Sequence, residues 1–220
     1  LDLQCTRSPL STVGMNVNTG TASFTINIER TVSAEYFSFT TSDTEYNVLC
    51  KIRSMPNSAY LLDNADFALG IVTGNNKEYI SDIKNENNEM ILKGADICKY
   101  HITRTNNYIV FKPENFQQAA PTEMYRSPEK LLYRFISSQL VFAYDDKQTL
   151  SLNSCNIVIP RLPGIKIKYV LAILNSRIAQ FIYKKEFNSV KVLRSHIENI
   201  PIPTADASTQ AEIIALTDKL

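Results

Sequence analysis

Hydrogen-bonding side chains gather in two polar loop segments of the sequence, and their types suit contact with the edges of nucleic-acid bases. Asparagine can bond adenine through two atoms, and arginine can bond guanine in the same way. The segments at residues 70–77 and 99–106 therefore supply candidate base contacts. These are Thr73, Asn75, Asn76 and Lys77 in the first segment, and Lys99, His101, Arg104 and Asn106 in the second. The same residue types are common in ordinary turns, and that interpretation stays open for each residue.

Positive charge is concentrated in one part of the sequence, although the chain as a whole is nearly neutral. The formal net charge is +1, yet residues 161–194 hold eight basic residues and one acidic residue. A basic face beside a neutral body is typical of phosphate contact, whereas a charge run is also often only a solvated surface. The candidate phosphate contacts follow a predicted helix, and they are Lys184, Lys185, Lys191 and Arg194.

Residue types used in catalysis occur here without the partners that catalysis requires. Residues 145–147, Asp-Asp-Lys, are adjacent in a predicted turn, which indicates a solvated turn rather than a metal-dependent nuclease centre. His101 and His196 have no matching nucleophile and carboxylate, so each is interpreted as a surface or hydrogen-bonded histidine. Residues 70–74 do not form the GxGxxG loop that holds a nucleotide cofactor. We therefore predict no catalytic residue and no metal site.

The cysteines and the hydropathy pattern indicate a reduced, water-soluble protein. Cys5, Cys50, Cys98 and Cys155 are scattered without a CxxC pair, so they predict buried thiols rather than disulfides or zinc ligands. No apolar run approaches the roughly 20 residues that a membrane helix needs. We expect a cytoplasmic protein with no membrane partner. Because the first residue is Leu1, we also expect a fragment of a longer polypeptide.

Capping residues and periodicity predict the scaffold that carries these side chains. Residues 24–28 alternate as a strand does, and Ser42 with Glu45 forms a capping box for a helix that ends near residue 53. Apolar runs predict strands at 67–72, 90–92, 140–144 and 156–159, and a hairpin formed by 100–103 and 108–111. The expected fold class is α+β, a mixed α/β domain with a curled, largely antiparallel sheet, three main helices and a C-terminal helix.

Three further helices are predicted along the second half of the chain. One begins at Ser127 and buries a stripe formed by Leu131, Leu132, Phe135 and Ile136. Another covers 168–183 and is interrupted at residues 175–176, Asn-Ser, which we interpret as a helix-packing device. Residues 201–203, Pro-Ile-Pro, block further regular structure, and a capping box at 209–212 begins the C-terminal helix.

Glycine-marked turns lie at two points near the candidate base contacts. Gly70, Gly74 and Gly94 are expected to permit backbone geometry that a side chain would obstruct. Asp96 is expected to close the second turn by accepting a backbone N–H bond. These four residues are therefore predicted to be structural.

The order of these motifs resembles one known family. GxxTGxN at residues 70–76, KGxDI at 93–97, VLAILNSRIAQFIY at 170–183 and IPIP at 200–203 are similar to the TaqI-like C-terminal specificity domain. The resemblance runs from about Ser42 to the C-terminus. That family supplies the target-recognition domain of type II and IIG restriction-modification adenine methyltransferases.

The resemblance implies a DNA-recognition module that directs an adenine-N6 methyltransferase, often with a nuclease, on the same polypeptide. Its expected partners are double-stranded DNA and the methyltransferase domain. S-adenosylmethionine, and Mg²⁺ where a nuclease is attached, would belong to the parent enzyme, so no cofactor is expected in this chain. The Asn/Asp-Pro-Pro-Tyr catalytic tetrapeptide of such methyltransferases is absent from the sequence, so the chain is expected to be non-catalytic by itself.

The predicted domain organisation has three parts. Residues 1–21 form a linker or irregular leading segment, 22–203 the target-recognition domain, and 204–220 a C-terminal helix. Two alternatives stay open. One is a protein–protein interaction module without DNA sequence recognition, which the capped terminal helix and the balanced charge favour. The other is an enzyme of a type that the motifs do not identify.

Overall fold

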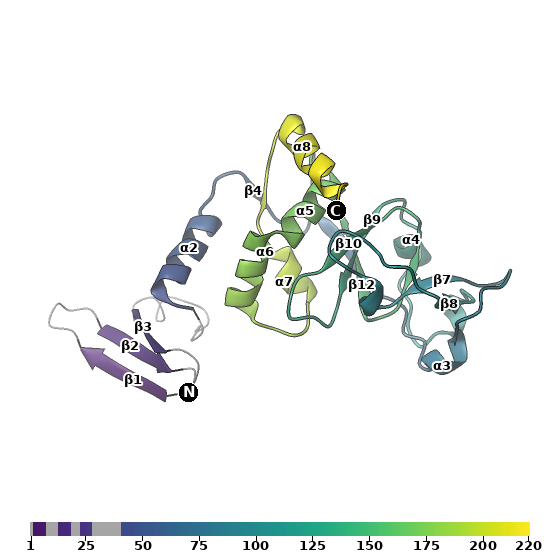
Figure 1. Cartoon of the computed structure of the whole chain (residues 1–220), viewed down its shortest axis with the longest axis horizontal. Helices are drawn as coiled ribbons and strands as arrows, with labels where there is room; N and C mark the ends of the chain where they lie inside the picture. Colours follow the sequence, from purple (N-terminus) through teal and green to yellow (C-terminus); the bar gives the residue numbers. More distant parts are fainter. Residues whose placement is uncertain (1, 8–12, 19–22, 28–40) are drawn as a thin grey trace. The chain divides into compact units, whose positions relative to one another are not determined.

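The computed structural model describes residues 2–7, 13–18, 23–27 and 41–220, which divide into two compact units, Leu1–Pro56 and Asn57–Leu220 (Figure 1). The described residues of the first unit form an antiparallel sheet of three strands in the order β1-β2-β3 and one helix. These elements are β1 (Asp2–Arg7), β2 (Val13–Asn18), β3 (Ser23–Asn27) and α2 (Asp43–Arg53).

The predictions for the first unit are confirmed in part. α2 begins with the predicted capping box, in which the Ser42 N–H donates to Glu45 Oε2 at 3.0 Å and the Glu45 N–H donates to Ser42 Oγ at 3.4 Å. β3 confirms the predicted strand, except for Ile28, which lies outside the described residues. The irregular segment predicted at 1–21 is wrong over β1 and β2. Val, Met and Val alternate at 13, 15 and 17, and the surrounding Ser, Thr and Asn residues masked this strand pattern.

The second unit contains two four-stranded sheets and a short strand pair. The larger sheet has the order β10-β9-β12-β5, and its neighbours are antiparallel. The smaller sheet has the order β11-β7-β8-β6, and its β11–β7 pair is parallel. The strands are β4 (Ser58–Ala59), β5 (Ala65–Ala68), β6 (Ile80–Ser81), β7 (Glu89–Leu92), β8 (Tyr108–Ile109), β9 (Lys130–Arg134), β10 (Phe142–Asp145), β11 (Leu150–Ser151), β12 (Cys155–Pro160) and β13 (Ile202–Pro203).

Helices connect and cover these sheets. They are α3 (Asn76–Tyr79), α4 (Thr122–Tyr125), α5 (Ile167–Asn175), α6 (Arg177–Ile182), α7 (Arg194–Glu198) and α8 (Ala207–Thr217), with 3₁₀ turns η1 (Gly94–Asp96) and η2 (Pro113–Asn115) and the π-helical turn η3 (Tyr183–Phe187). Within the second unit, α6 and α7 lie on one side of the larger sheet, and α3, β7 and β8 lie on the other (Figure 1). The mixed α+β class with largely antiparallel sheets is confirmed.

The helix predicted from Ser127 is wrong, because residues 130–134 form the strand β9 in the middle of the larger sheet. Leu131 and Leu132 are both fully buried although they point to opposite faces of the strand. A strand that is covered on both faces has a continuous apolar run instead of an alternating one. The capping residues near Ser127 favour a helix, but residues 130–134 pair with β10 and β12 and form a strand instead.

The hairpin predicted between 100–103 and 108–111 is also wrong. Ile102 pairs with Ile97 across a tight turn that contains Tyr100 at φ 75°, whereas β8 pairs with β6 and β7. Residues 201–203 were expected to block regular structure, but Ile202 and Pro203 form the strand β13, which pairs with β4. The N-cap of α8 is Asp206, whose Oδ1 accepts from the Thr209 N–H at 2.8 Å, so this helix begins before the predicted capping box.

The core of the second unit lies between its two large sheets. Fully buried apolar side chains from both sheets meet there, including Ile91 and Leu92 of β7, Leu132 of β9 and Ile157 of β12. Burial of such side chains is the main favourable contribution to folding. Among the described residues, no helix is long and apolar enough to cross a membrane.

A buried ion pair joins the ends of β9 and β10. Lys130 is 0% exposed and Asp145 is 2% exposed, and their Nζ and Oδ2 atoms are 2.5 Å apart. Lys130 Nζ also donates to the Tyr125 carbonyl at 2.7 Å, and the carboxylate accepts from the backbone and hydroxyl of Thr149 at 2.9 and 2.8 Å. The predicted solvated turn at 145–147 is therefore wrong for Asp145. The side chains at 146 and 147 are exposed, as expected.

We expect Lys130→Met to lower the free energy of unfolding by about 3–5 kcal/mol, because Asp145 stays buried without its cation. Urea denaturation of the whole chain measures this change. Lys147→Met is the matched control, since its side chain is 79% exposed, and we expect a change below about 0.5 kcal/mol. Equal losses in the two variants would contradict a stabilising role for the buried pair.

Candidate nucleic-acid interface

Gly70 and Gly94 let two separate segments lie close to the turn formed by residues 152–155. A Cβ atom on Gly70 would lie 2.1 Å from the Leu152 carbonyl oxygen, and one on Gly94 would lie 2.4 Å from the Ser154 carbonyl oxygen. Their N–H groups donate to side chains beside this turn, to Asn156 Oδ1 at 3.1 Å and to Ser154 Oγ at 3.0 Å. Both glycines therefore stand where any side chain would overlap backbone atoms. Gly74 also has the expected special geometry, with φ +84°.

Asp96 bonds across the second turn, because its Oδ2 accepts from the Lys93 N–H at 2.7 Å. Its carbonyl oxygen has a second role. It accepts from the backbone N–H of Thr103 at 2.8 Å and from the hydroxyl of the same residue at 2.9 Å. The turn at η1 is therefore bonded to the start of the loop that carries Arg104 and Asn106.

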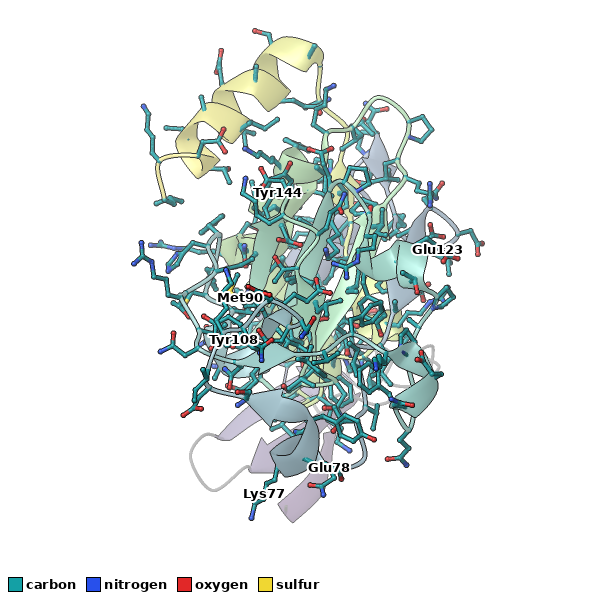
Figure 2. All side chains as sticks on the ribbon, turned by 90° about the vertical axis from the view of Figure 1, so that its right-hand side faces the viewer. Lys77, Glu78, Met90, Tyr108, Glu123 and Tyr144 are labelled. Atoms are coloured by element: carbon teal, nitrogen blue, oxygen red, sulfur yellow. The ribbon has the colours of Figure 1, made fainter. Side chains whose placement is uncertain are left out.

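The first segment of candidate base contacts leads into α3. Thr73 is only 5% exposed, and its hydroxyl donates to Asn76 Oδ1 at 2.6 Å, so both side chains bond within the turn. Asn75 is exposed, and its Nδ2 lies 3.4 Å from Glu78 Oε2. Lys77 is exposed and lies beside Glu78 at the lower edge of the face seen in Figure 2. Asn75, Asn76 and Lys77 are thus exposed, and of these three only Lys77 makes no side-chain hydrogen bond with the described residues.

The second segment separates into one anchored and three accessible residues. Lys99 is half-buried with its Nζ 3.4 Å from the Asn175 carbonyl oxygen, and burial lowers the pKa of its ammonium group. His101, Arg104 and Asn106 are exposed. Because these three side chains make no hydrogen bond or ion pair with the described residues, they are available to a ligand.

The candidate phosphate contacts surround the end of the α6–η3 helix. Lys184 lies in η3 and is exposed, as is Lys191 on the strand-like segment that pairs with Ile136. Lys185 lies beside Lys184 in η3. Arg194 is engaged twice, since its guanidinium lies 5.1 Å from the centre of the Phe67 ring and its Nε donates to Glu198 Oε1 at 2.6 Å. It borders a groove of about 400 Å³ beside β5.

The two sets of candidate contacts do not form one cluster. The first base-contact segment lies with α3 beyond the larger sheet, and the lysines of η3 follow α6 on its other side (Figure 1). Lys99 is the candidate that approaches the helices, through its contact with the end of α5. Within the described residues, no group of three or more His, Cys, Asp or Glu side chains is arranged to hold a metal ion.

Comparison with known proteins identifies the family. The family model of the TaqI-like C-terminal specificity domain matches residues 89–202, which is more than half of the 220 residues. The chain belongs to this family. The matched stretch of the specificity domain includes η1, the loop with Arg104 and Asn106, and all four candidate phosphate contacts.

Two solved structures are similar to this specificity domain at low identity. One is the crystal structure of an HsdS subunit from Thermoanaerobacter tengcongensis, with 14% identity, a TM-score of 0.44, and coverage of 80% of this chain and 42% of that one. The other describes complex assembly and conformational transition of the type I R-M system, with 14% identity, a TM-score of 0.46, and coverage of 80% and 43%. This chain therefore spans less than half the length of either. No curated protein matches it.

Two side-chain amides of the helical family motif attach it to the larger sheet, a role that was not predicted from the sequence. The Asn175 amide bonds both backbone groups of Phe142, accepting from its N–H at 3.0 Å and donating to its carbonyl at 2.9 Å. Gln180 bonds both backbone groups of Leu140 in the same way, at 2.9 and 3.0 Å. These amides cover the outer edge of the larger sheet at β10. Polar amides within an apolar helix were the available signal, and the packing role predicted for residues 175–176 is confirmed, with Ser176 as N-cap of α6.

His196 belongs to an aromatic cluster in the specificity domain. Its ring stacks on Phe187 with centroids 4.5 Å apart, and its Nδ1 accepts from the Leu193 N–H at 3.2 Å. Burial lowers the pKa of this imidazole below its usual value of 6.5. The neutral ring fits this environment, which agrees with a hydrogen-bonded histidine rather than a catalytic one.

We expect Gly94→Ala to destabilise the fold by at least about 2 kcal/mol, because its new methyl group would overlap a backbone oxygen that a side-chain rotation cannot move. Thermal and urea unfolding measure this loss. The neighbouring Ala95 is exposed, so Ala95→Ser is the control and should change stability by less than about 0.5 kcal/mol. Unchanged stability in Gly94→Ala would contradict the close approach to Ser154.

We expect the stability of the wild-type chain to fall relative to His196→Phe as the pH drops from about 7 to about 5. The folded-state pKa of His196 is lowered, so the unfolded chain binds the proton more tightly. The contribution of the neutral ring is complete above the unfolded-state pKa of about 6.5 and decreases below it. Urea denaturation of both proteins across this range tests the sign, and a constant difference would contradict a buried neutral imidazole.

Proposed function

We propose that this chain is the sequence-specific DNA-recognition module of a restriction-modification enzyme. The observation that carries the proposal is the family match over residues 89–202, because this stretch contains both the Arg104–Asn106 loop and the basic segment at 184–194. In this proposal, exposed side chains on loops contact base edges, and lysines on the helical side of the larger sheet neutralise phosphates. Contacts to phosphates position a protein on the duplex, whereas contacts to bases select the sequence.

The accessible residues refine which candidates would contact bases. Arg104 and Asn106 combine exposure with the two side-chain types that discriminate guanine and adenine best. Lys77 and His101 are accessible as well, whereas Thr73, Asn75, Asn76 and Lys99 would first have to give up internal bonds. We therefore assign the principal base contacts to Arg104 and Asn106, and the principal phosphate contacts to Lys184 and Lys191.

The parent enzyme would provide the chemistry. We propose that a methyltransferase domain on the same polypeptide transfers a methyl group to adenine N6, in the cytoplasm, and that a nuclease can accompany it. S-adenosylmethionine, and Mg²⁺ for cleavage, would bind there. Residues 70–74 form no nucleotide-binding glycine loop, and in the part of the chain that the structure describes no group of three or more His, Cys, Asp or Glu side chains could hold a metal ion.

The second candidate is a protein-interaction module, and the surface of α8 favours it. Leu216 and Leu220 are 62% and 70% exposed at this end of the chain. A groove of about 340 Å³ with a mostly apolar lining, including Ala211, Ile214 and Ala215, lies where α8 meets the start of α5. Such a surface suits a partner helix, and this candidate predicts no salt-dependent affinity for duplex DNA.

Selection of bound duplexes from a randomised DNA pool separates the two candidates. The pool is tested at low and moderate salt, with an unrelated basic protein as control. We expect enrichment of one short sequence at both salt concentrations. Salt-sensitive binding without enrichment would contradict sequence recognition by this chain alone, and absence of binding at both concentrations would favour the interaction module.

We expect mutations in the two contact sets to have different effects on the selected duplex. Arg104→Ala and Asn106→Ala should change the preferred sequence and lose about 1–3 kcal/mol of discrimination. Lys191→Ala should weaken binding to all duplexes alike and reduce the salt slope by about 1. Fluorescence anisotropy across a salt series measures both quantities. Lys147→Ala, an exposed lysine outside both sets, is the control, and uniform loss of affinity in all variants would contradict the division of roles.

A further inference from the structure

The loop that carries Arg104 and Asn106 has no regular secondary structure, yet both of its ends are fixed to one short stretch of chain, residues 91–96. At its start, Thr103 makes two bonds to the Asp96 carbonyl oxygen, at 2.8 and 2.9 Å. At its end, the Asn107 carbonyl accepts from the Ile91 N–H of β7 at 2.9 Å. The stretch itself is fixed by the close approach of Gly94 to Ser154.

Lys93 supplies the side-chain contact that completes this arrangement. Its Nζ donates to Asn107 Oδ1 at 2.6 Å. The other side of the same amide, Nδ2, donates to Thr105 Oγ1, and Thr105 is only 8% exposed. The ammonium group thus orients an amide that in turn holds the middle of the loop inward.

The inward residues alternate with the candidate base contacts. Thr105 is buried and Asn107 is half-buried, whereas Arg104 and Asn106 are exposed on either side of Thr105. Neither exposed side chain makes a hydrogen bond or an ion pair with the described residues. The side-chain bonds within the loop are therefore made by Thr105 and Asn107, and they leave Arg104 and Asn106 exposed.

We propose that Lys93 is a positioning residue, which holds the 103–107 loop in the conformation that presents Arg104 and Asn106 to DNA bases. This inference rests on the proposed function and adds a residue that contacts no base itself. A loop that is already ordered loses less conformational entropy on binding, so its contacts contribute more of their energy to affinity. The effect should appear for the cognate sequence, where both side chains bond base edges, and not for other duplexes.

The test compares Lys93→Met, Asn107→Ala and the double variant, in the whole chain, on the duplex selected from the randomised pool. Methionine keeps the apolar length of lysine and removes the donor. We expect each single variant to bind the selected duplex about tenfold more weakly, with unchanged affinity for a scrambled duplex and an unchanged salt slope. Because both residues act through one bond, the double variant should also lose about tenfold rather than about a hundredfold.

Lys84→Met is the matched control, since Lys84 is an exposed lysine of the same unit, and we expect no change in either affinity. Equal weakening on both duplexes with a smaller salt slope would show that Lys93 is a phosphate contact, and would overturn the proposal. A lower melting temperature with unchanged discrimination would assign Lys93 a purely structural role, which also overturns it. Absence of any preferred sequence for the wild-type chain would instead contradict the proposed function.

A second measurement does not depend on DNA. Backbone amide hydrogen exchange at residues 103–107 reports how ordered the loop is in the free protein. We expect exchange there to become several-fold faster in Lys93→Met than in the wild type, with no change in β9 and β12. Unchanged exchange in the loop would overturn the positioning role, even if the preferred DNA sequence had been established.

Discussion

The second unit depends on the close contact of three backbone segments at the turn formed by residues 152–155. This turn takes the chain from β11 in the smaller sheet to β12 in the larger one. The Leu152 N–H donates to the Leu92 carbonyl at 2.8 Å, and the Asn153 N–H donates to the Ile71 carbonyl at 3.1 Å. Gly70 and Gly94 make this approach possible, because any side chain at either position would meet backbone oxygen.

The positions of the candidate contacts follow from this junction. The segment after Gly70 leads through Gly74 into α3, and the segment after Gly94 leads through η1 to the loop with Arg104 and Asn106. Both loops therefore begin at a point that is fixed within the core. Residues of the glycine motifs make internal bonds, whereas the exposed side chains between them make few, so a rigid scaffold presents exposed polar groups.

The helical side of the unit is joined to the sheet by polar contacts rather than by apolar packing alone. Asn175 bonds the backbone of the edge strand β10 at Phe142, and Gln180 bonds the backbone at Leu140 just before it, so both amides take bonds that a neighbouring strand would otherwise make. An uncovered strand edge would present unpaired N–H and C=O groups to other chains. Lys99 also lies against the end of α5, because its Nζ contacts the Asn175 carbonyl oxygen. This contact links the second polar loop to the helices α5 and α6, which precede the basic segment.

Much of the local structure could be predicted from the sequence. The capping box at Ser42, the strands β3, β10 and β12, the helix interrupted at Ser176, and the bond from Asp96 to its own turn all depend on residues within a few positions of each other. Periodicity and capping encode such features directly. The residue types of the candidate contacts were also evident from the sequence, as was the concentration of positive charge before residue 194.

Only the tertiary structure decided which segments pair and which polar groups remain accessible. β9 looked helical because it is buried on both faces, and β8 joined two strands that precede it instead of forming the expected hairpin. Lys93 and Asn107 are 14 residues apart, and Gly70 and Asn156 are 86 apart, so no local pattern connects them. Sequence by itself determined the caps, the turns and the residue types. Folding determined their partners, because strand pairing and loop anchoring join residues that are distant along the chain.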